Sequence, residues 1–400
     1  MLAPNAQPGH SRPACTAQVT AFIVERAFGG ITSGPPEDKL GIRASQTCEV
    51  TFDNVRVPVE NVLGGGDDGR EGGRAGIGQG FMVAMNILNN GRFGIGAAAG
   101  AMGRKVMASC AEHALTRTQF GDKLSSFGLI QDKMTTMAVN SYSTESIAYM
   151  TTGMIDRGDP SCEVEAACCK VYGSEKGFES INDAIQIFGG MGFMKDFPFE
   201  RMMRDCRILS IFEGTNEILR LMIALSGLKA AGDRLKSLGK LAANPLSDPL
   251  ALLHEAGTRV ENKLRPQPVE SVHPRLQKYG NKLRVDTVAF GTAVEQLLVK
   301  HGKDVIHEQL QLRRVADCAI DLYICTAVLA RASRALEAGT PTAEHEAELA
   351  AHACAGASLR VRQHLKEMGG FSESHDARVA SIAAAVFESG GCVAPHPLGV

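Results

Sequence analysis

Hydrophobic and polar residues alternate with two different periods along this chain, and the change between them divides it into regions. Residues 19–25 and 48–57 alternate apolar and polar side chains, which is the pattern of half-buried strands. Beyond about residue 80, apolar residues recur every three or four positions, the period of a helix with one buried face. We therefore expect a short β region followed by a long helical region.

Capping residues and breaks in the helical period indicate where the helices begin and end. One helical stretch runs up to Arg117–Gly121, where the period breaks, and a second contains Ile130. Asp159 followed by Pro160 predicts the start of a third helix with Pro at its first position, and Gly189–Gly192 predicts its end. Long helices joined by short loops are typical of an antiparallel bundle.

Residues 229–270 differ in character from the helical stretch before them. Leucines alternate there with lysines and arginines, and four prolines interrupt the segment. This pattern indicates a linker with amphipathic basic pieces, either solvated or in contact with a membrane surface. Helical periodicity resumes in residues 281–338 and 342–388.

The predicted organisation has five parts. Two or three short strands cannot form an independent sheet with a buried face, so the β region is interpreted as the last piece of a β domain. The ranges are 1–18 for an irregular N-terminus, 19–63 for the end of the β domain, 64–228 for the helical bundle, 229–270 for the amphipathic linker and 271–400 for a C-terminal helical domain.

Composition argues against several classes of function. The net charge of −2 provides no electrostatic basis for binding nucleic acid, and no apolar run reaches the roughly 18 residues of a membrane span. The 11 cysteines are scattered without a CxxC pair, which predicts reduced core thiols in an intracellular compartment. The histidines are dispersed without an HExxH motif, so no metal site is predicted.

The segment Ile211–Glu217 places one acidic residue, Glu213, between a bulky apolar residue and a glycine. Thr215 is a favourable N-cap, so we expect a helix to begin at Asn216. Glu213 then lies in the turn before a helix, where a carboxylate can meet a small substrate at close range. The alternative is a surface acid with no chemical role.

Other segments have some features of ligand sites. Gly94–Gly100 comes near a GxGxxG motif but follows a helix, so its glycines are predicted to permit close helix approach rather than dinucleotide binding. Gly189–Gly192 leaves backbone groups bare for a phosphate or adenine, or is a plain C-cap. Arg117–Gly121 suits a pyrophosphate, or is an exposed helix junction. Asn89 and Arg92 share a helix face. Either both side chains point into a pocket, or Arg92 pairs with a nearby carboxylate.

Five motifs follow one another in a specific order, at residues 89–94, 117–121, 186–193, 204–208 and 211–218. In this order they resemble the acyl-CoA dehydrogenase family, in particular its very-long-chain branch and the sister complex I assembly protein. The resemblance covers residues 19–400. It implies a mainly α fold, in which a helix bundle of the family's C-terminal type follows a remnant of a β domain and precedes an extra helical domain.

The resemblance implies FAD-dependent α,β-dehydrogenation of long or very-long-chain fatty acyl-CoA to trans-2-enoyl-CoA in fatty acid β-oxidation, with electrons passed to electron-transfer flavoprotein. Glu213 would be the base for the α-proton, made more basic by apolar surroundings, and the Gly214 backbone N–H would meet the thioester carbonyl. Asn89 and Arg92 would lie near the thioester and the CoA moiety. The implied FAD contacts are Arg117, Phe120, Gln131, Gln186, Gly189, Gly190, Thr215, Asn216 and Glu217.

The resemblance also implies a homodimer at the matrix face of the mitochondrial inner membrane, with Arg117 and Phe120 contacting FAD across the dimer interface. One departure from the family pattern stands out, because the helical domain and the flavin-gripping loops expected before Val19 are not found. The sequence is therefore interpreted as truncated, without a transit peptide, and expected to bind FAD weakly. A catalytically impaired homologue that dimerises or serves respiratory complex I assembly is the alternative.

Overall fold

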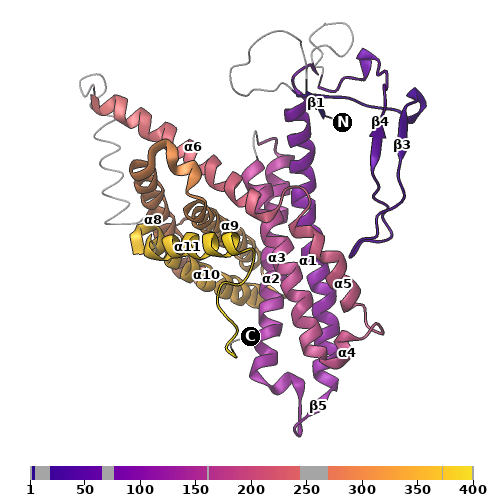
Figure 1. Cartoon of the computed structure of the whole chain (residues 1–400). Helices are drawn as coiled ribbons and strands as arrows, with labels where there is room; N and C mark the ends of the chain where they lie inside the picture. Colours follow the sequence, from indigo (N-terminus) through magenta and orange to yellow (C-terminus); the bar gives the residue numbers. More distant parts are fainter. Residues whose placement is uncertain are drawn as a thin grey trace.

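The computed structural model describes residues 2–4, 19–64, 76–159, 162–243, 269–371 and 373–398, and long helices dominate these ranges. Three of them, α1 (Gly80–Thr116), α2 (Gly128–Asp156) and α3 (Glu163–Phe188), pack side by side as an upright bundle (Figure 1). The mainly α fold and the helix bundle predicted from the period of the apolar residues are confirmed.

Glycines allow the bundle helices to approach closely. A Cβ atom added to Gly100 would lie 2.8 Å from Cγ of Glu145 on α2, and one added to Gly173 would lie 2.8 Å from Cα of Gly96. Side chains at these positions would force the helix axes apart. Gly96 and Gly100 are therefore part of a helix-packing surface, as the sequence predicted, whereas a Cβ atom at Gly94 would meet nothing within 4 Å.

The ends of the bundle helices follow the sequence signals in part. The predicted break at residue 117 is a hairpin of β5 (Thr118–Gln119) and β6 (Asp122–Lys123), and α3 ends just before Gly189. The predicted helix start at Pro160 lies outside the described residues, and α3 begins at Glu163.

The chain then returns along the bundle. After α3 come α4 (Gly190–Phe193), α5 (Phe199–Cys206) and the short 3-10 helix η5 (Arg207–Ser210), and α6 (Asn216–Ala243) begins at the predicted residue. Because α6 continues to Ala243, it crosses the predicted start of a linker at residue 229. The amphipathic pieces of that segment extend a helix, and residues 244–268 of the predicted linker lie outside the described residues.

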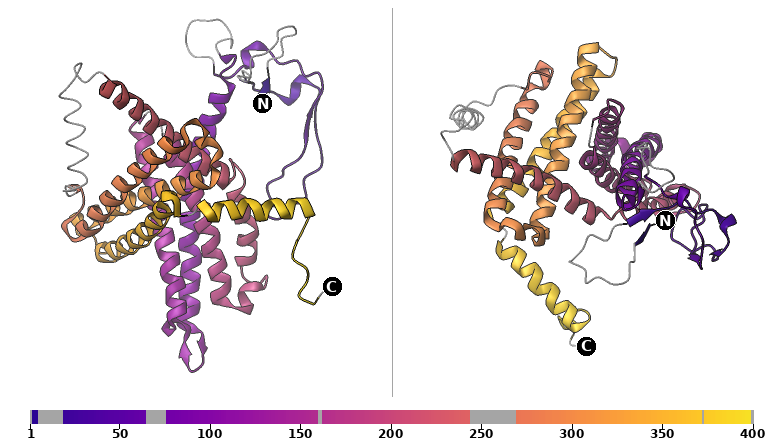
Figure 2. Two further views of the ribbon diagram at one scale, coloured as in Figure 1. Left: turned by 60° about the vertical axis from the view of Figure 1, so that its left-hand side comes forward. Right: turned by 90° about the horizontal axis from the view of Figure 1, so that it is seen from above.

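The C-terminal region is helical, as its period predicts. It contains α8 (Gln277–His301), α9 (Gln309–Ala338), α10 (Ala343–Lys366) and α11 (Glu373–Ser389). Apolar residues of α8, α9 and α10 form one continuous core with apolar residues of α2, α3 and α6. Only α11 stands apart, projecting from the body of the molecule (Figure 2), and none of its residues is buried.

The β region consists of short pairs. The described strands are β1 (Leu2–Pro4), β2 (Val19–Ala21), β3 (Ile31–Ser33) and β4 (Val50–Phe52), joined as two antiparallel pairs, β1 with β2 and β3 with β4. β1 falls within the stretch predicted to be irregular, and β3 was not predicted. This region is attached to α5, because the backbone N–H of Ile42 donates to Oδ1 of Asp205 at 2.6 Å.

No helix in the described part of the chain is both long enough and apolar enough to cross a lipid bilayer.

Candidate active site

The turn that carries Glu213 joins η5 to α6, and its conformation is unusual. The backbone φ angles are +56° at Glu213 and +95° at Gly214, so two successive residues adopt the left-handed region. For a residue other than glycine this conformation costs on the order of 1 kcal/mol and persists only where surrounding contacts enforce it. Thr215 caps the helix as predicted, because its hydroxyl accepts a bond of 3.4 Å from the backbone N–H of Ile218.

The Glu213 carboxylate lies directly against α1. A Cβ atom at Gly91 would come within 2.5 Å of Oε1 and 2.7 Å of Oε2, so a glycine is needed there to leave room for the acid. Oε2 is buried and has no hydrogen-bond partner among the described residues. A buried carboxylate oxygen without a donor is costly, and such oxygens in folded proteins usually have a partner.

Arg92 holds this turn from the bundle side. The residue is 4% exposed, and its Nε donates to the backbone oxygen of Glu213 at 3.3 Å while Nη1 donates to Oδ1 of Asn89 at 2.8 Å. Burial lowers the pKa of Arg92, opposed by the attraction of Glu213. The structure thus brings Asn89, Arg92 and Glu213 together, and it shows the arginine bound to the backbone of the turn rather than paired with its carboxylate.

A second buried cation, Lys170 of α3, was missed by the sequence analysis. Its Nζ donates to the backbone oxygen of Gly214 and to Oδ1 of Asn216, both at 2.8 Å. Burial lowers the pKa of Lys170 to about 8, against the opposing attraction of Glu213. The available signal was a lysine inside the otherwise apolar run 166–171.

Asn216 belongs to the same buried network. Its side chain is 2% exposed, and Nδ2 donates to Oγ of Ser174 and to Oε1 of Glu175, both at 3.0 Å. Arg220 in turn holds Glu175 through two bonds of 2.7 and 2.9 Å. The Asn216 side chain therefore faces inward, because the first turn of α6 packs against α3. Its contact with the flavin stays a prediction.

Thr215 and Glu217 stay at the outer side of this turn. Glu217 is exposed, and its own backbone N–H together with the Thr215 hydroxyl lowers the pKa of its carboxyl group. An anion in the first turn of α6 is favoured by the helix dipole. We refer to residues 211–217 as the Glu213 turn.

The remaining predicted residues gather at the opposite end of the bundle. His113 of α1 stacks on Phe188 of α3 with ring centroids 4.1 Å apart, which brings the ends of these helices together. Six exposed residues occupy this region, which we call the bundle tip: Arg117, Phe120, Gln131, Gln186, Gly189 and Gly190.

The bundle tip and the Glu213 turn are far apart in one chain. From Gly91 to Arg117 the rise of α1 is about 39 Å. The tip is also open to solvent, with the Phe120 ring 93% exposed. Across the described ranges, no three His, Cys, Asp or Glu side chains converge as metal ligands.

Two family models match the helical part of the chain. "Acyl-CoA dehydrogenase, C-terminal domain" matches residues 78–228, and "ACAD9/ACADV, C-terminal domain" matches residues 274–392. The first range contains the Glu213 turn and the bundle tip, and the second contains α8 to α11 up to Cys392.

Comparison with solved structures shows the same relationship. An acyl-CoA dehydrogenase from Bacillus anthracis, complexed with FAD, is similar with a TM-score of 0.72 and 29% identity, over 88% of this chain and 59% of that one. Butyryl-CoA dehydrogenase from Megasphaera elsdenii has a TM-score of 0.50 and 33% identity, over 57% of this chain and 55% of that one.

Curated relatives extend the likeness to nearly the whole sequence. The very long-chain specific acyl-CoA dehydrogenases of Bos taurus and Homo sapiens are each 45% identical over 96% of this chain. The match covers 58% of the length of either relative. On the order of its motifs, its fold and these similarities, the chain belongs to the acyl-CoA dehydrogenase family.

Proposed function

We propose that the chain carries the catalytic base of an FAD-dependent dehydrogenase that converts fatty acyl-CoA thioesters to trans-2-enoyl-CoA. The observation that supports this most directly is the buried Oε2 of Glu213, which has no donor among the described residues. It lies at the end of a strained turn, against a glycine that leaves it room. A carboxylate held in this way is prepared to accept a proton from a bound substrate.

In the proposed reaction, Glu213 accepts the α-proton of the thioester, and the electron pair of that C–H bond forms the new double bond as the β-hydrogen leaves with its own electron pair. Bound FAD supplies the acceptor for those two electrons and the β-hydrogen. The Gly214 N–H is the proposed donor to the thioester carbonyl, where negative charge develops. Arg92 and Lys170 hold the two carbonyl groups of the turn, which keeps the base in position.

The bundle tip has suitable groups for the cofactor. Arg117 provides a guanidinium for a pyrophosphate, Phe120 an exposed ring for stacking, and Gly189 and Gly190 a backbone open to close approach. About 39 Å of α1 separates the bundle tip from Gly91, which lies beside the Glu213 turn. One dinucleotide therefore cannot reach both the bundle tip and the Glu213 turn of the same chain. This separation supports a homodimer in which the tip of one copy completes the cofactor site of the other.

The narrower features are proposed by analogy with the relatives. Their names specify very long-chain substrates and mitochondria, which supports long or very-long-chain acyl-CoA as substrate and a mitochondrial location here. We further propose the matrix face of the inner membrane, with contact through residues 229–270, and electron-transfer flavoprotein as electron acceptor. Lys229 and Lys236 are exposed on α6 and provide basic groups for such contact.

The test is to titrate the purified chain with FAD and assay palmitoyl-CoA oxidation with an artificial electron acceptor. Glu213→Gln should lower turnover by about 10² to 10⁴, the usual contribution of a general base, without preventing palmitoyl-CoA binding. Glu348→Gln, an exposed acid on α10, is the matched control and should not change turnover. Full activity of Glu213→Gln would refute the role of the base, and no turnover at saturating FAD would refute the proposed activity of this chain.

A second candidate, a non-catalytic protein that self-associates or serves respiratory complex I assembly, is favoured by α11. This helix has no buried residue, and its exposed apolar residues recur at helical spacing: Val379, Ile382, Val386 and Phe387. An absence of turnover together with self-association that Phe387→Ser weakens, measured by analytical ultracentrifugation, would select this function over the first.

A further inference from the structure

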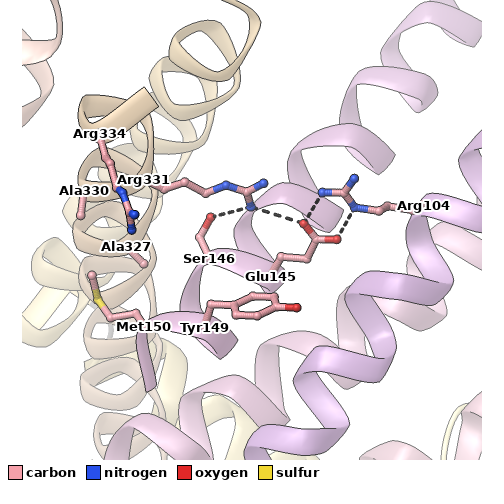
Figure 3. Close-up of a pocket in the computed structure, with 9 residues that line it drawn as sticks. All are labelled: Arg104, Glu145, Ser146, Tyr149, Met150, Ala327, Ala330, Arg331 and Arg334. Carbon is pink, nitrogen blue, oxygen red and sulfur yellow. Dashed lines mark hydrogen bonds and ion pairs between the residues drawn. The ribbon is translucent and has the colours of Figure 1, made fainter. Parts of the chain in front are cut away.

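A cavity of ≈ 610 Å³ lies where α1 and α2 of the bundle meet α9 of the C-terminal region (Figure 3). It is separate from the Glu213 turn, because Arg104 on its wall follows Gly91 by about 20 Å of helix rise. A cavity of this size falls within the range of about 300 to 1,000 Å³ that is typical of small-molecule sites. The proposed reaction uses none of its residues.

One wall of the cavity is a cluster of charged groups around Glu145. Glu145 is 9% exposed, and its carboxylate accepts bonds from Nε and Nη2 of Arg104, the second of them 2.5 Å long. Arg331 of α9 also donates to it, at 3.3 Å, and donates to Oγ of Ser146 at 3.4 Å. The Arg331 guanidinium lies 4.1 Å from the centre of the Tyr142 ring. These bonds fix Glu145 and Arg331 in place before any ligand binds.

The charges on the wall are not balanced. Three arginines, Arg104, Arg331 and Arg334, line the cavity together with a single carboxylate, Glu145, which leaves a formal excess of two positive charges. Glu346 reaches Arg331 at 3.4 Å and reduces this excess by one. Arg334 is exposed and makes no hydrogen bond or ion pair with any described residue. The cavity therefore contains a cation that is available to an incoming anion.

The other groups on the wall are apolar or aromatic. Met150, Ala327 and Ala330 lie on the same side of the view as Arg334, and Tyr149 lies below Glu145 (Figure 3). The Tyr149 side chain is 75% exposed, although its ring is large enough to cover an apolar ligand. An inorganic anion would contact only the arginines and leave this half of the wall unused.

We propose that this cavity binds an amphiphilic organic anion, with a phosphate or carboxylate head on Arg334 and an apolar body against Met150 and Tyr149. Guanidinium groups bind both kinds of head through paired N–H donors. The ligand would contact the bundle and the C-terminal region at once, so it would stabilise their association by mass action.

The test is isothermal titration calorimetry of the chain with decyl phosphate and with decanoate. Arg334→Gln removes an exposed side chain without a partner, so the fold should be retained, and binding of both probes should weaken at least tenfold. Arg313→Gln is the matched control, because Arg313 is exposed on the same helix but does not line the cavity, and it should change binding less than twofold. Ala330→Leu, which fills the apolar wall, should weaken the alkyl probes as well.

Three results would overturn the proposal: equal binding by the Arg334→Gln variant, equal affinity for decyltrimethylammonium, or equal affinity for inorganic phosphate. Equal binding by the Arg334→Gln variant would also show that the probes bind elsewhere, such as at the proposed acyl-CoA site. This binding measurement does not depend on whether the chain has dehydrogenase activity. Vesicles with phosphatidic acid distinguish the source of the head group. Arg334-dependent uptake onto vesicles assigns a lipid, and binding of decyl phosphate without such uptake assigns a free ligand.

Discussion

The Glu213 turn and the bundle tip differ in how their polar groups are satisfied. At the turn, two buried cations, Arg92 and Lys170, hold backbone carbonyls, and Asn216 is bonded on several sides. At the tip, Arg117, Gln131 and Gln186 are exposed. The first region is organised by the chain itself, which suits a group that must be placed accurately for chemistry. The second is a surface that another molecule has to complete.

The largest expected contrast is in stability. Asn216→Ala should lower the free energy of unfolding by about 2 to 4 kcal/mol, because Lys170 and Ser174 each lose a partner in a buried site. Gln186→Ala at the exposed tip should change it by less than about 0.5 kcal/mol. Urea denaturation followed by circular dichroism measures both. Equal losses would show that the two regions do not differ in this way.

The pH dependence of stability provides a sharper probe of the turn. The pKa of Lys170 is lowered by burial to about 8 in the folded chain, from 10.5 in the unfolded one. Between these values only the unfolded state holds the proton, so the free energy of unfolding should rise with pH from about 8 to 10.5, by at most about 3 kcal/mol. Lys170→Met should abolish this rise. A rise of the same size in both proteins would assign it to other groups.

The space for the carboxylate can be tested with a pair of glycines on α1. Gly91→Ala places a methyl group within 2.5 Å of Glu213 Oε1, so the carboxylate must move and turnover should fall about tenfold, equivalent to about 1.4 kcal/mol. Gly94→Ala is the control, because a Cβ there meets nothing within 4 Å, and it should stabilise the helix by about 0.5 to 1 kcal/mol. If both variants retained full turnover in the palmitoyl-CoA assay, the tight fit of Glu213 against Gly91 would have no role in catalysis.

The smallest expected effect is at the bundle tip, and it has the opposite sign. Phe120 and Gly121 have φ angles of +52° and +91°, as a type I′ hairpin turn requires, although asparagine is favoured over phenylalanine at the first position. Phe120→Asn should therefore stabilise the chain by about 1 kcal/mol. It should also weaken self-association, measured by sedimentation, if the exposed ring serves a partner. A loss of stability would contradict the strain assigned to this turn.

Local patterns predicted the elements well. The period of the apolar residues indicated the bundle, and Thr215 predicted the first residue of α6, because a cap acts through contacts within one turn. The same rules failed at residue 229, where basic residues and prolines further along suggested a linker while α6 continued to Ala243. Leucines and basic residues at this spacing suit an amphipathic helix as well as a linker, and α6 extends through the first part of the stretch.

Contacts between distant segments could not be predicted from such patterns. Nothing near Lys170 in the sequence indicates that it bonds to Gly214, and a lysine in an amphipathic helix usually faces solvent. The cavity around Glu145 likewise needs Arg104, Glu145 and Arg331 from three different helices. These interactions depend on which helix faces meet, which only the packed structure determines.

The sequence by itself therefore determined the helices, the capped turn and the position of one acidic residue in that turn, since each depends on neighbours within a few residues. The tertiary structure decided the surroundings of Glu213. Gly91 makes room for its carboxylate, Arg92 and Lys170 hold the carbonyl groups of its turn, and Asn216 points inward. It also decided that the two sets of predicted site residues lie about 39 Å apart along α1. The physical reason is that burial and unpaired polar atoms are properties of the packed chain and not of any single segment.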